Sequence, residues 1–443
     1  MAHEITDQLI DRLHSYSDTS RTVARNAVAH AGVEAVAFDR AKVVATPTVV
    51  SHKVDDWKVT SQKKSGRCWL FSSLNLLRST TRTHLGLKDF EFSQNYVLFW
   101  DKFERANFFL TDVIATATSE ALDGRLLQFL LGDVLSDGGQ WDMAVSLYLK
   151  HGLVPKTAMP ETESSGHTAP MNDRLKVVLR RTALELRALV EAGATGEEIN
   201  EVKEAALADV WRILVICLGE PPASFEWEWR DDEGGFHRDG VLTPREFYAR
   251  YVDVDLTKYV CLVDDPRAAH PKGHTLTVDH MGNVVGGRPI LYVNAPVETI
   301  RSITTRVLAS GRAVWFGADC SQQSDRDSGL FVDGLYDFDS LFGVDFSTSK
   351  EQRVNTGESA MNHAMLFTGV DIDEAGEGRR FRVENSWGEE PGEKGFFTMD
   401  AAWFDANVFE VAVHVDDLPA ELRAVVAEEP LHLPAWDPMG ALA

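Results

Sequence analysis

The stretch Thr60–Leu77, TSQKKSGRCWLFSSLNLL, places a glutamine, a glycine and a cysteine at fixed offsets just before an apolar run. Gly66 suits a tight turn, and Cys68 begins a segment whose apolar residues recur at helical spacing. These residues are Leu70, Phe71, Leu74 and Leu77. The spacing predicts a buried helix that starts at Cys68. Unpaired N–H groups and the positive dipole end of such a helix favour a thiolate, so Cys68 is the first candidate for a nucleophile.

The residues around this cysteine decide between a reactive thiol and an inert one. A buried cysteine often packs as a small hydrophobe. Here, however, GRCWLFS resembles the GxCWxFS signature around the nucleophile of papain-type cysteine peptidases, and Gln62 lies six residues before Cys68. The resemblance implies that the Gln62 side chain and the Cys68 backbone N–H form an oxyanion hole. One such donor typically contributes about 3 to 4 kcal/mol in the transition state.

A cysteine nucleophile needs a base, and the base needs an orienting group. His363 begins the strand-like run HAMLFTGVDID, and a histidine in such a place, taken alone, is more often structural. Asn385 opens the sequence Asn-Ser-Trp-Gly, which resembles the papain-family motif that carries the orienting asparagine. A hairpin that turns at Glu374–Gly378 would bring His363 and Asn385 side by side. Trp387 is expected to shield their hydrogen bond from water.

A glycine pair occurs in DGGQWDM, at Gly138 and Gly139. Glycines allow another backbone to approach closely, although the pair also suits an ordinary turn. The stretch resembles the Gly-Gly segment that lines the substrate cleft of papain-like enzymes. Gly138 and Gly139 are therefore candidate substrate-binding residues.

Composition and charge limit the functions open to the chain. It has 443 residues, a hydrophobic content of 44% and a formal net charge of −24. This charge argues against nucleic acid or an anionic membrane as a partner. The longest basic group is Lys63, Lys64 and Arg67, which could stabilise a thiolate. Four widely spaced cysteines, the absence of a signal-peptide pattern and the absence of a long apolar stretch predict a cytoplasmic protein without a transmembrane helix.

Three histidines invite a metal hypothesis. They are His270, His274 and His280, in a loop without carboxylates or cysteines at ligand spacing. Solvated loop histidines are the expected outcome. The sequence predicts neither a metal site nor a cofactor.

Periodicity predicts elements along the rest of the chain. Residues 1–59 should form one or two helices and an extended stretch. Helices are expected at Gln94 to about Phe109 after a capping Ser93, at Trp141–Leu149, at Asp173–Glu191 and Glu197–Leu218 as a hairpin, and after Thr243. Strands are expected near Phe225–Trp229 and at 290–297, 313–320, 363–373 and 379–387.

The separation of Cys68 and His363, about 300 residues, is roughly twice that of papain-sized enzymes. Together with motifs through to the terminal AWDPMGALA, it resembles the bleomycin hydrolase and aminopeptidase C family of papain-like peptidases. The resemblance implies an α+β fold: a helical half, an antiparallel β-barrel-like half, a helical insertion, and a C-terminal arm in the cleft. Four parts follow. Residues 1–160 carry the nucleophile, 161–262 form the insertion and a candidate oligomerisation subdomain, 263–430 carry the catalytic His and Asn, and 431–443 form the arm.

The resemblance also implies a function. The chain is expected to be a cysteine aminopeptidase that releases N-terminal residues from peptides through a thioester, to hydrolyse bleomycin-type amides as well, and to form a homohexamer. Ala443 would place its carboxylate where the substrate's ammonium group arrives. Two alternatives stay open. One is an endopeptidase or acyl transferase with the same triad, and the other is a non-catalytic oligomeric scaffold.

Overall fold

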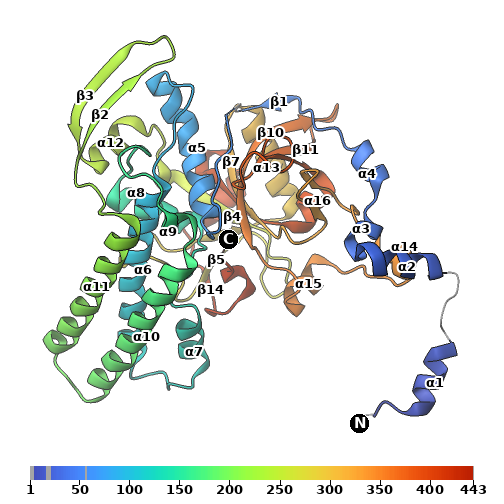
Figure 1. Ribbon diagram of the computed structural model, residues 1–443, viewed down its shortest axis with the longest axis horizontal. Helices are drawn as coiled ribbons and strands as arrows, with labels where there is room; N and C mark the ends of the chain where they lie inside the picture. Colours follow the sequence, from blue (N-terminus) through green and yellow to red (C-terminus); the bar gives the residue numbers. More distant parts are fainter. Residues whose placement is uncertain (1–3, 16–20, 55–56, 443) are drawn as a thin grey trace. The chain divides into compact units, whose positions relative to one another are not determined.

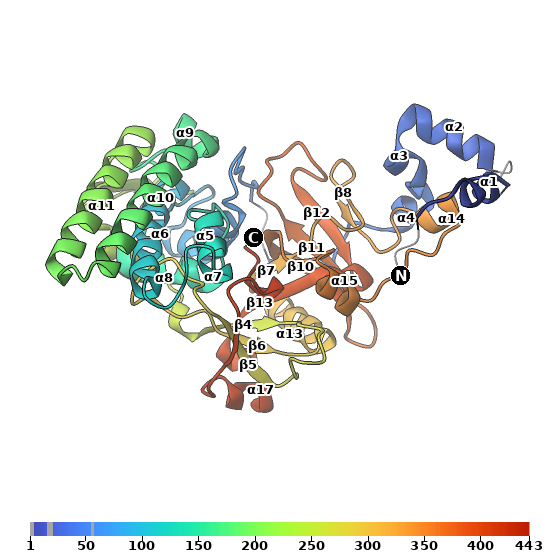
Figure 2. The same cartoon turned by 90° about the horizontal axis from the view of Figure 1, so that it is seen from below.

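The computed structural model describes residues 4–15, 21–54 and 57–442, which fall into two units. Unit 1 comprises residues 1–47 and 333–348, and unit 2 comprises residues 48–332 and 349–443. The α+β fold expected from the sequence is present: unit 2 combines a helical part with a large, mostly antiparallel sheet (Figures 1 and 2). The four-part division into 1–160, 161–262, 263–430 and 431–443 stays a prediction.

Unit 1 consists of short helices, where the sequence predicts one or two at the N-terminal end. They are α1 (Asp7–Ser15), α2 (Thr22–Ala31), α3 (Val33–Ala37), α4 (Arg40–Ala45) and α14 (Phe338–Phe342). Gly32 ends α2 with φ at 90°, and Asp39 starts α4 by accepting a hydrogen bond from the Ala41 N–H at 2.8 Å. Arg21 donates to the Ser340 and Leu341 carbonyls at 2.7 and 2.8 Å, so two distant stretches of sequence form this unit.

The helical part of unit 2 begins at the cysteine. Its helices are α5 (Cys68–Leu85), α6 (Gln94–Thr116), α7 (Arg125–Gly132), α8 (Trp141–His151), α9 (Glu163–Gly166), α10 (Ala169–Glu191), α11 (Gly196–Leu218) and α12 (Pro244–Tyr251). Ser93 caps α6 as predicted, by accepting from the Tyr96 N–H at 3.0 Å. The helix runs seven residues past the predicted end at Phe109, because its apolar face continues through Leu110 and Val113.

The predicted helical hairpin is formed by α10 and α11, which lie side by side in both views (Figures 1 and 2). Thr195 starts α11 with a capping box in which Glu198 bonds back to the Thr195 N–H. A two-stranded hairpin follows, with β2 (Phe225–Arg230) antiparallel to β3 (Phe236–Leu242). Thr243 then starts α12 with the capping box that the sequence predicts.

Twelve strands of the described chain form one sheet in the order β14-β5-β6-β4-β13-β7-β10-β11-β12-β9-β8, with β1 paired to β10. They are β1 (His52–Lys53), β4 (Tyr259–Val263), β5 (His274–Val278), β6 (Tyr292–Asn294), β7 (Val314–Ala318), β8 (Ser324–Asp325), β9 (Leu330–Phe331), β10 (His363–Ile372), β11 (Gly378–Glu384), β12 (Phe396–Asp400), β13 (Val408–His414) and β14 (Leu431–Leu433). The central pairs are antiparallel, whereas β9, β6 and β14 each join by a parallel pair. Helices α13 (Val297–Ala309), α15 (Lys350–Thr356), α16 (Ala401–Asn407) and α17 (Ala420–Val425) complete this part.

Tryptophans fill the seam between the helices and the sheet. Trp69 on α5 is fully buried, and its carbonyl accepts from the Trp315 indole N–H on β7 at 3.3 Å. Trp141 on α8 packs against Trp315 with ring centroids 5.7 Å apart. The C-terminal segment runs between the two parts of unit 2 in both views (Figures 1 and 2).

None of the helices described above is both long enough and apolar enough to cross a bilayer.

Candidate active site

Cys68 is the first residue of α5, as the sequence predicts, and only 2% of it is exposed. The backbone N–H groups of Ala364 and Trp69 point at its sulfur and lower its pKa. Burial has the larger effect and raises the pKa of Cys68 to about 11. Desolvation therefore opposes the preference for a thiolate that is expected at the helix start.

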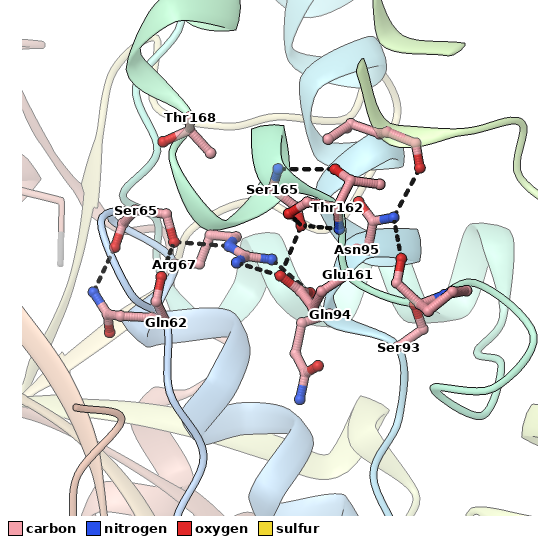
Figure 3. Close-up of polar contacts among 12 residues, drawn as sticks. Gln62, Ser65, Arg67, Ser93, Gln94, Asn95, Glu161, Thr162, Ser165 and Thr168 are labelled. Carbon is pink, nitrogen blue, oxygen red and sulfur yellow. Dashed lines mark hydrogen bonds and ion pairs between the residues drawn. The ribbon is translucent and has the colours of Figure 1, made fainter. Parts of the chain in front are cut away.

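The loop before Cys68 is held by an ion pair between the fully buried Arg67 and the partly buried Glu161. Arg67 donates to both Glu161 oxygens, at 3.0 and 2.8 Å, and to the Ser65 hydroxyl at 2.8 Å (Figure 3). The positive charge of Arg67 is thus paired with the carboxylate of Glu161. The suggestion that the basic group near the cysteine stabilises a thiolate is wrong for Arg67, because its charge is paired with a carboxylate. Arg67 instead fixes the turn from which α5 starts.

A second, partly buried carboxylate contacts the same loop. Asp137 accepts from the Gly66 N–H at 3.2 Å and forms an ion pair with Lys102 at 2.6 Å. Burial alone would raise the pKa of Asp137, but Lys102 holds it well below its usual range. A side chain at Gly66 would lie 2.9 Å from the Asp137 Cβ, which explains why glycine occupies this position.

His363 is the first residue of β10, and its ring is buried. Its Nε2 lies 2.9 Å from the Asn385 Oδ1, and its ring stacks on Trp387 with centroids 4.8 Å apart. A carbonyl oxygen accepts hydrogen bonds only, so this contact requires the proton on Nε2 and leaves Nδ1 free to act as a base. Burial lowers the pKa of His363 to about 4, although the bond to Asn385 opposes the shift.

The structure brings Cys68 and His363 to the same place from opposite ends of the chain. Helix α5 packs against β10, and Ala364, the residue after His363, directs its N–H toward the Cys68 sulfur. Strands β10 and β11 pair antiparallel around a turn closed by the Asp373 N–H and the Glu377 carbonyl, which places Asn385 beside His363. The predicted hairpin thus places the imidazole and the carboxamide together near the thiol.

Gln62 lies in the loop that precedes Cys68, and 7% of its surface is exposed. Its Oε1 accepts from the Ser386 hydroxyl at 2.5 Å, and its Nε2 donates to the Ser65 carbonyl at 2.6 Å. The Gln62 N–H also donates to the Ser386 carbonyl at 2.8 Å. A primary amide has two N–H bonds, so one remains for a substrate oxygen.

The glycine pair packs against the start of α5. Trp69 donates its indole N–H to the Asp137 carbonyl at 2.7 Å, and a Cβ at Gly139 would lie 2.5 Å from the Trp69 ring. The Gly138 carbonyl accepts from Arg105 at 2.9 Å. Gly139 is therefore required for packing whatever its role toward substrate, and substrate binding by Gly138 and Gly139 stays a prediction.

The C-terminal segment reaches this region. Gln140, next to the glycine pair, donates from its Nε2 to the Ala441 carbonyl at 2.7 Å. Ala443, predicted to meet the substrate's ammonium group, lies outside the described residues. Its role stays a prediction.

Two of the loop histidines lie within hydrogen-bond distance of carboxylates. His270 lies 2.6 Å from Asp265, and His280 lies 3.2 Å from Asp112. Within residues 4–15, 21–54 and 57–442, no group of three or more His, Cys, Asp or Glu side chains is placed to hold a metal ion. His274 at the start of β5 is exposed.

Several residues that support the site were missed by the sequence analysis. Ser386 was one residue away from a motif already identified, so the Asn-Ser-Trp-Gly sequence was the available signal. No sequence signal marked Glu161 or Asp137, because each forms its ion pair with a residue that is far away in the sequence.

Comparison with known proteins places this geometry in a family. The model of the Peptidase C1-like family matches residues 3–440. Aminopeptidase C of Lactobacillus helveticus is 40% identical over 450 residues, covering 100% of this chain and 99% of that protein. Human bleomycin hydrolase is 41% identical, covering 98% and 97%. The crystal structure of PepW from Lactobacillus rhamnosis HN001 is 42% identical and superposes with a TM-score of 0.98 over 100% of both chains. The chain therefore belongs to the Peptidase C1-like family.

Proposed function

We propose that this chain is a cysteine aminopeptidase that releases N-terminal residues from peptides through a thioester acyl-enzyme. The observation that carries the proposal is the contact between His363 Nε2 and Asn385 Oδ1, made where the next residue, Ala364, directs its N–H at the Cys68 sulfur. Relatives named aminopeptidase C and bleomycin hydrolase, similar over the whole chain, support the reaction. Hydrolysis of bleomycin-type amides is part of the proposal.

In the proposed mechanism, His363 Nδ1 takes the proton of Cys68 as the sulfur attacks the substrate carbonyl. Burial opposes the charged form of both groups, because it raises the pKa of Cys68 and lowers the pKa of His363. The Cys68 N–H and the remaining Gln62 N–H stabilise the oxyanion. His363 then protonates the leaving amine, and water hydrolyses the thioester with His363 as base.

A substrate panel tests this proposal. Wild type should hydrolyse aminoacyl amides and free peptides, and should act poorly on the N-acetylated forms. Cys68→Ala should abolish turnover, whereas Cys217→Ala, which removes another free thiol, should not. Faster hydrolysis of N-acetylated than of free peptides would favour an endopeptidase. No hydrolysis at all by folded wild type would favour a scaffold.

The preference for a free N-terminus is assigned to the C-terminal arm, residues 431–443. Support comes from the bond between Gln140 and Ala441, beside the Gly138–Gly139 segment. An arm at this position would obstruct peptides that extend beyond their N-terminal residue. Truncation from residue 442 inward should lower aminopeptidase activity and admit N-acetylated peptides.

We also propose a cytoplasmic homohexamer, as the family resemblance implies. Exposed apolar side chains on the insertion support contact with another subunit at this surface. Val177 on α10 is 60% exposed and Ile216 on α11 is 77% exposed. Light scattering should then give a mass about six times that of the 49.2 kDa chain. A monomer at micromolar concentration would refute this assembly.

A further inference from the structure

A buried ion pair holds the C-terminal arm. Arg267, in the loop after β4, donates to both carboxylate oxygens of Asp437, at 3.0 and 2.6 Å. The two side chains are only 13% and 8% exposed. Two parallel hydrogen bonds between charged groups fix orientation as well as distance.

Arg267 is held in position by a second carboxylate, Asp265. Asp265 is fully buried and accepts from the Arg267 Nε at 2.9 Å and Nη2 at 2.7 Å. Asp265 also lies 2.6 Å from His270 and accepts from the Arg267 N–H. These bonds fix the guanidinium group independently of the arm. Two of its N–H groups are therefore already oriented to donate to the Asp437 carboxylate.

The arm beyond Asp437 is held by weaker, uncharged contacts. Asp437 caps the turn η4 (Pro438–Gly440) by accepting from the Met439 N–H at 2.9 Å. The Met439 carbonyl lies 3.4 Å from the Tyr292 hydroxyl, and the Ala441 carbonyl accepts from Gln140. Two side chains of the described residues 431–442 contact an oppositely charged or titratable partner: His432 lies 2.6 Å from Asp279, and Asp437 pairs with Arg267. His432 precedes the turn and is 58% exposed, so Asp437 carries the buried charge contact of the arm.

We propose that Arg267 determines substrate specificity by clamping Asp437, which holds the end of the arm beside Gln140 and excludes peptides with a blocked or extended N-terminus. The inference rests on the proposed function. Loss of Arg267 leaves the Asp437 carboxylate unpaired, so the arm's end gains by moving into water. Loss of the Asp437 charge leaves Arg267 paired with Asp265 and removes the attraction that holds the arm's end.

Asp437→Asn is the cleaner test, because asparagine keeps the helix-capping ability and leaves the Arg267–Asp265 pair intact. Arg267→Met is the complementary variant, since it keeps most of the aliphatic stem. The matched control is Asp417→Asn. It breaks another two-bond pair, with Arg312 at 2.8 and 2.6 Å, which lies outside the arm and the proposed catalytic machinery.

The readout is the ratio of kcat/KM for an N-acetylated peptide to that for the same peptide with a free N-terminus. Asp437→Asn and Arg267→Met should raise this ratio about tenfold or more. Chymotrypsin, which can cut after Trp436, should also cut their arms faster, as followed by mass spectrometry. Asp417→Asn should keep the wild-type ratio. A general loss of fold would lower both rates together and would not raise the ratio.

The experiment distinguishes failure of the clamp, meaning the Arg267–Asp437 ion pair that holds the arm, from failure of the proposed aminopeptidase function. If folded Asp437→Asn and wild type share one ratio while wild type cleaves free peptides, the clamp is wrong and the aminopeptidase stands. If wild type cleaves both peptides equally, the arm excludes nothing and the clamp is again wrong. If wild type cleaves neither peptide, the proposed function fails, and the clamp fails with it.

Discussion

Ser386 connects the two sides of the proposed catalytic machinery. Its hydroxyl donates to the Gln62 Oε1 at 2.5 Å, while its N–H donates at 2.8 Å to the Asn385 oxygen that faces His363. A hydroxyl that donates to Oε1 fixes which end of the Gln62 amide presents its N–H groups. One serine therefore sets the amide orientation of the proposed oxyanion donor and supports the group that orients the base.

Ser386→Ala should lower kcat about fivefold to tenfold with little change in KM, because an oxyanion donor acts mainly in the transition state. Steady-state kinetics of Ser386→Ala, Gln62→Ala and the double variant form a cycle. In the Gln62→Ala background, removing the Ser386 hydroxyl should have almost no further effect. Independent, additive effects of the two substitutions on kcat/KM would show that the hydroxyl does not act through Gln62.

Three substitutions at the proposed triad should differ in severity. Cys68→Ala should abolish turnover, since it removes the nucleophile. His363→Ala should nearly abolish it, and Asn385→Ala should leave measurable activity because the imidazole keeps its position in β10 and its stacking on Trp387. The ranking is checked with one aminoacyl amide. A thiol-directed epoxide should label Cys68 of wild type, and label on Cys320 instead would contradict the assignment.

The central strand β13 carries a buried acid. Glu410 pairs in register with Val263 on β4 and with Gly317 on β7, and 2% of it is exposed. Burial raises its pKa to about 8, and the nearby Asp142 adds to the shift, whereas the Cys261 thiol opposes it by hydrogen bonding. The folded protein thus keeps Glu410 protonated at neutral pH.

This strand makes stability depend on pH. Between about pH 4.5, the ordinary pKa of the residue, and pH 8, the folded state holds a proton that the unfolded state has lost. The folding free energy contributed by protonated Glu410 is therefore complete below pH 4.5 and is lost as pH rises to 8, by up to roughly 5 kcal/mol. Glu410→Gln cannot ionise, so its Tm should exceed that of wild type by an amount that grows up to pH 8. Denaturation at several pH values measures this, and a pH-independent Tm difference would contradict it.

Elements with local signals were predictable from the sequence. Ser93 and Thr243 marked helix starts, and two apolar runs separated by a polar turn predicted the β10–β11 hairpin with its His363 and Asn385. Pairings between distant segments were not predictable, because a single charged residue does not indicate its partner. Arg267 and Asp437 are separated by 170 positions, and neither lies in a pattern that indicates the other.

At the scale of the whole molecule, charge is the dominant property of the chain. A formal charge of −24 creates a negative potential around it. An aminopeptidase substrate carries a positive ammonium group, so the field attracts the proposed substrates and repels anionic ones. This attraction changes the rate at which substrate and enzyme meet, whereas the buried thiol and imidazole determine the rate of the chemical step.

Salt should therefore lower kcat/KM without lowering kcat. The Debye length is about 20 Å at about 20 mM ionic strength and about 7 Å at about 200 mM, so added salt confines the attraction to short range. Arginine amide carries two positive charges and leucine amide carries one, so arginine amide should lose more of its kcat/KM over this range. Initial rates for both amides at matched pH measure the difference, with sucrose in place of salt as the control for solution density. Equal losses for the two amides, or a loss confined to kcat, would show that the net charge of the chain plays no part in attracting substrate.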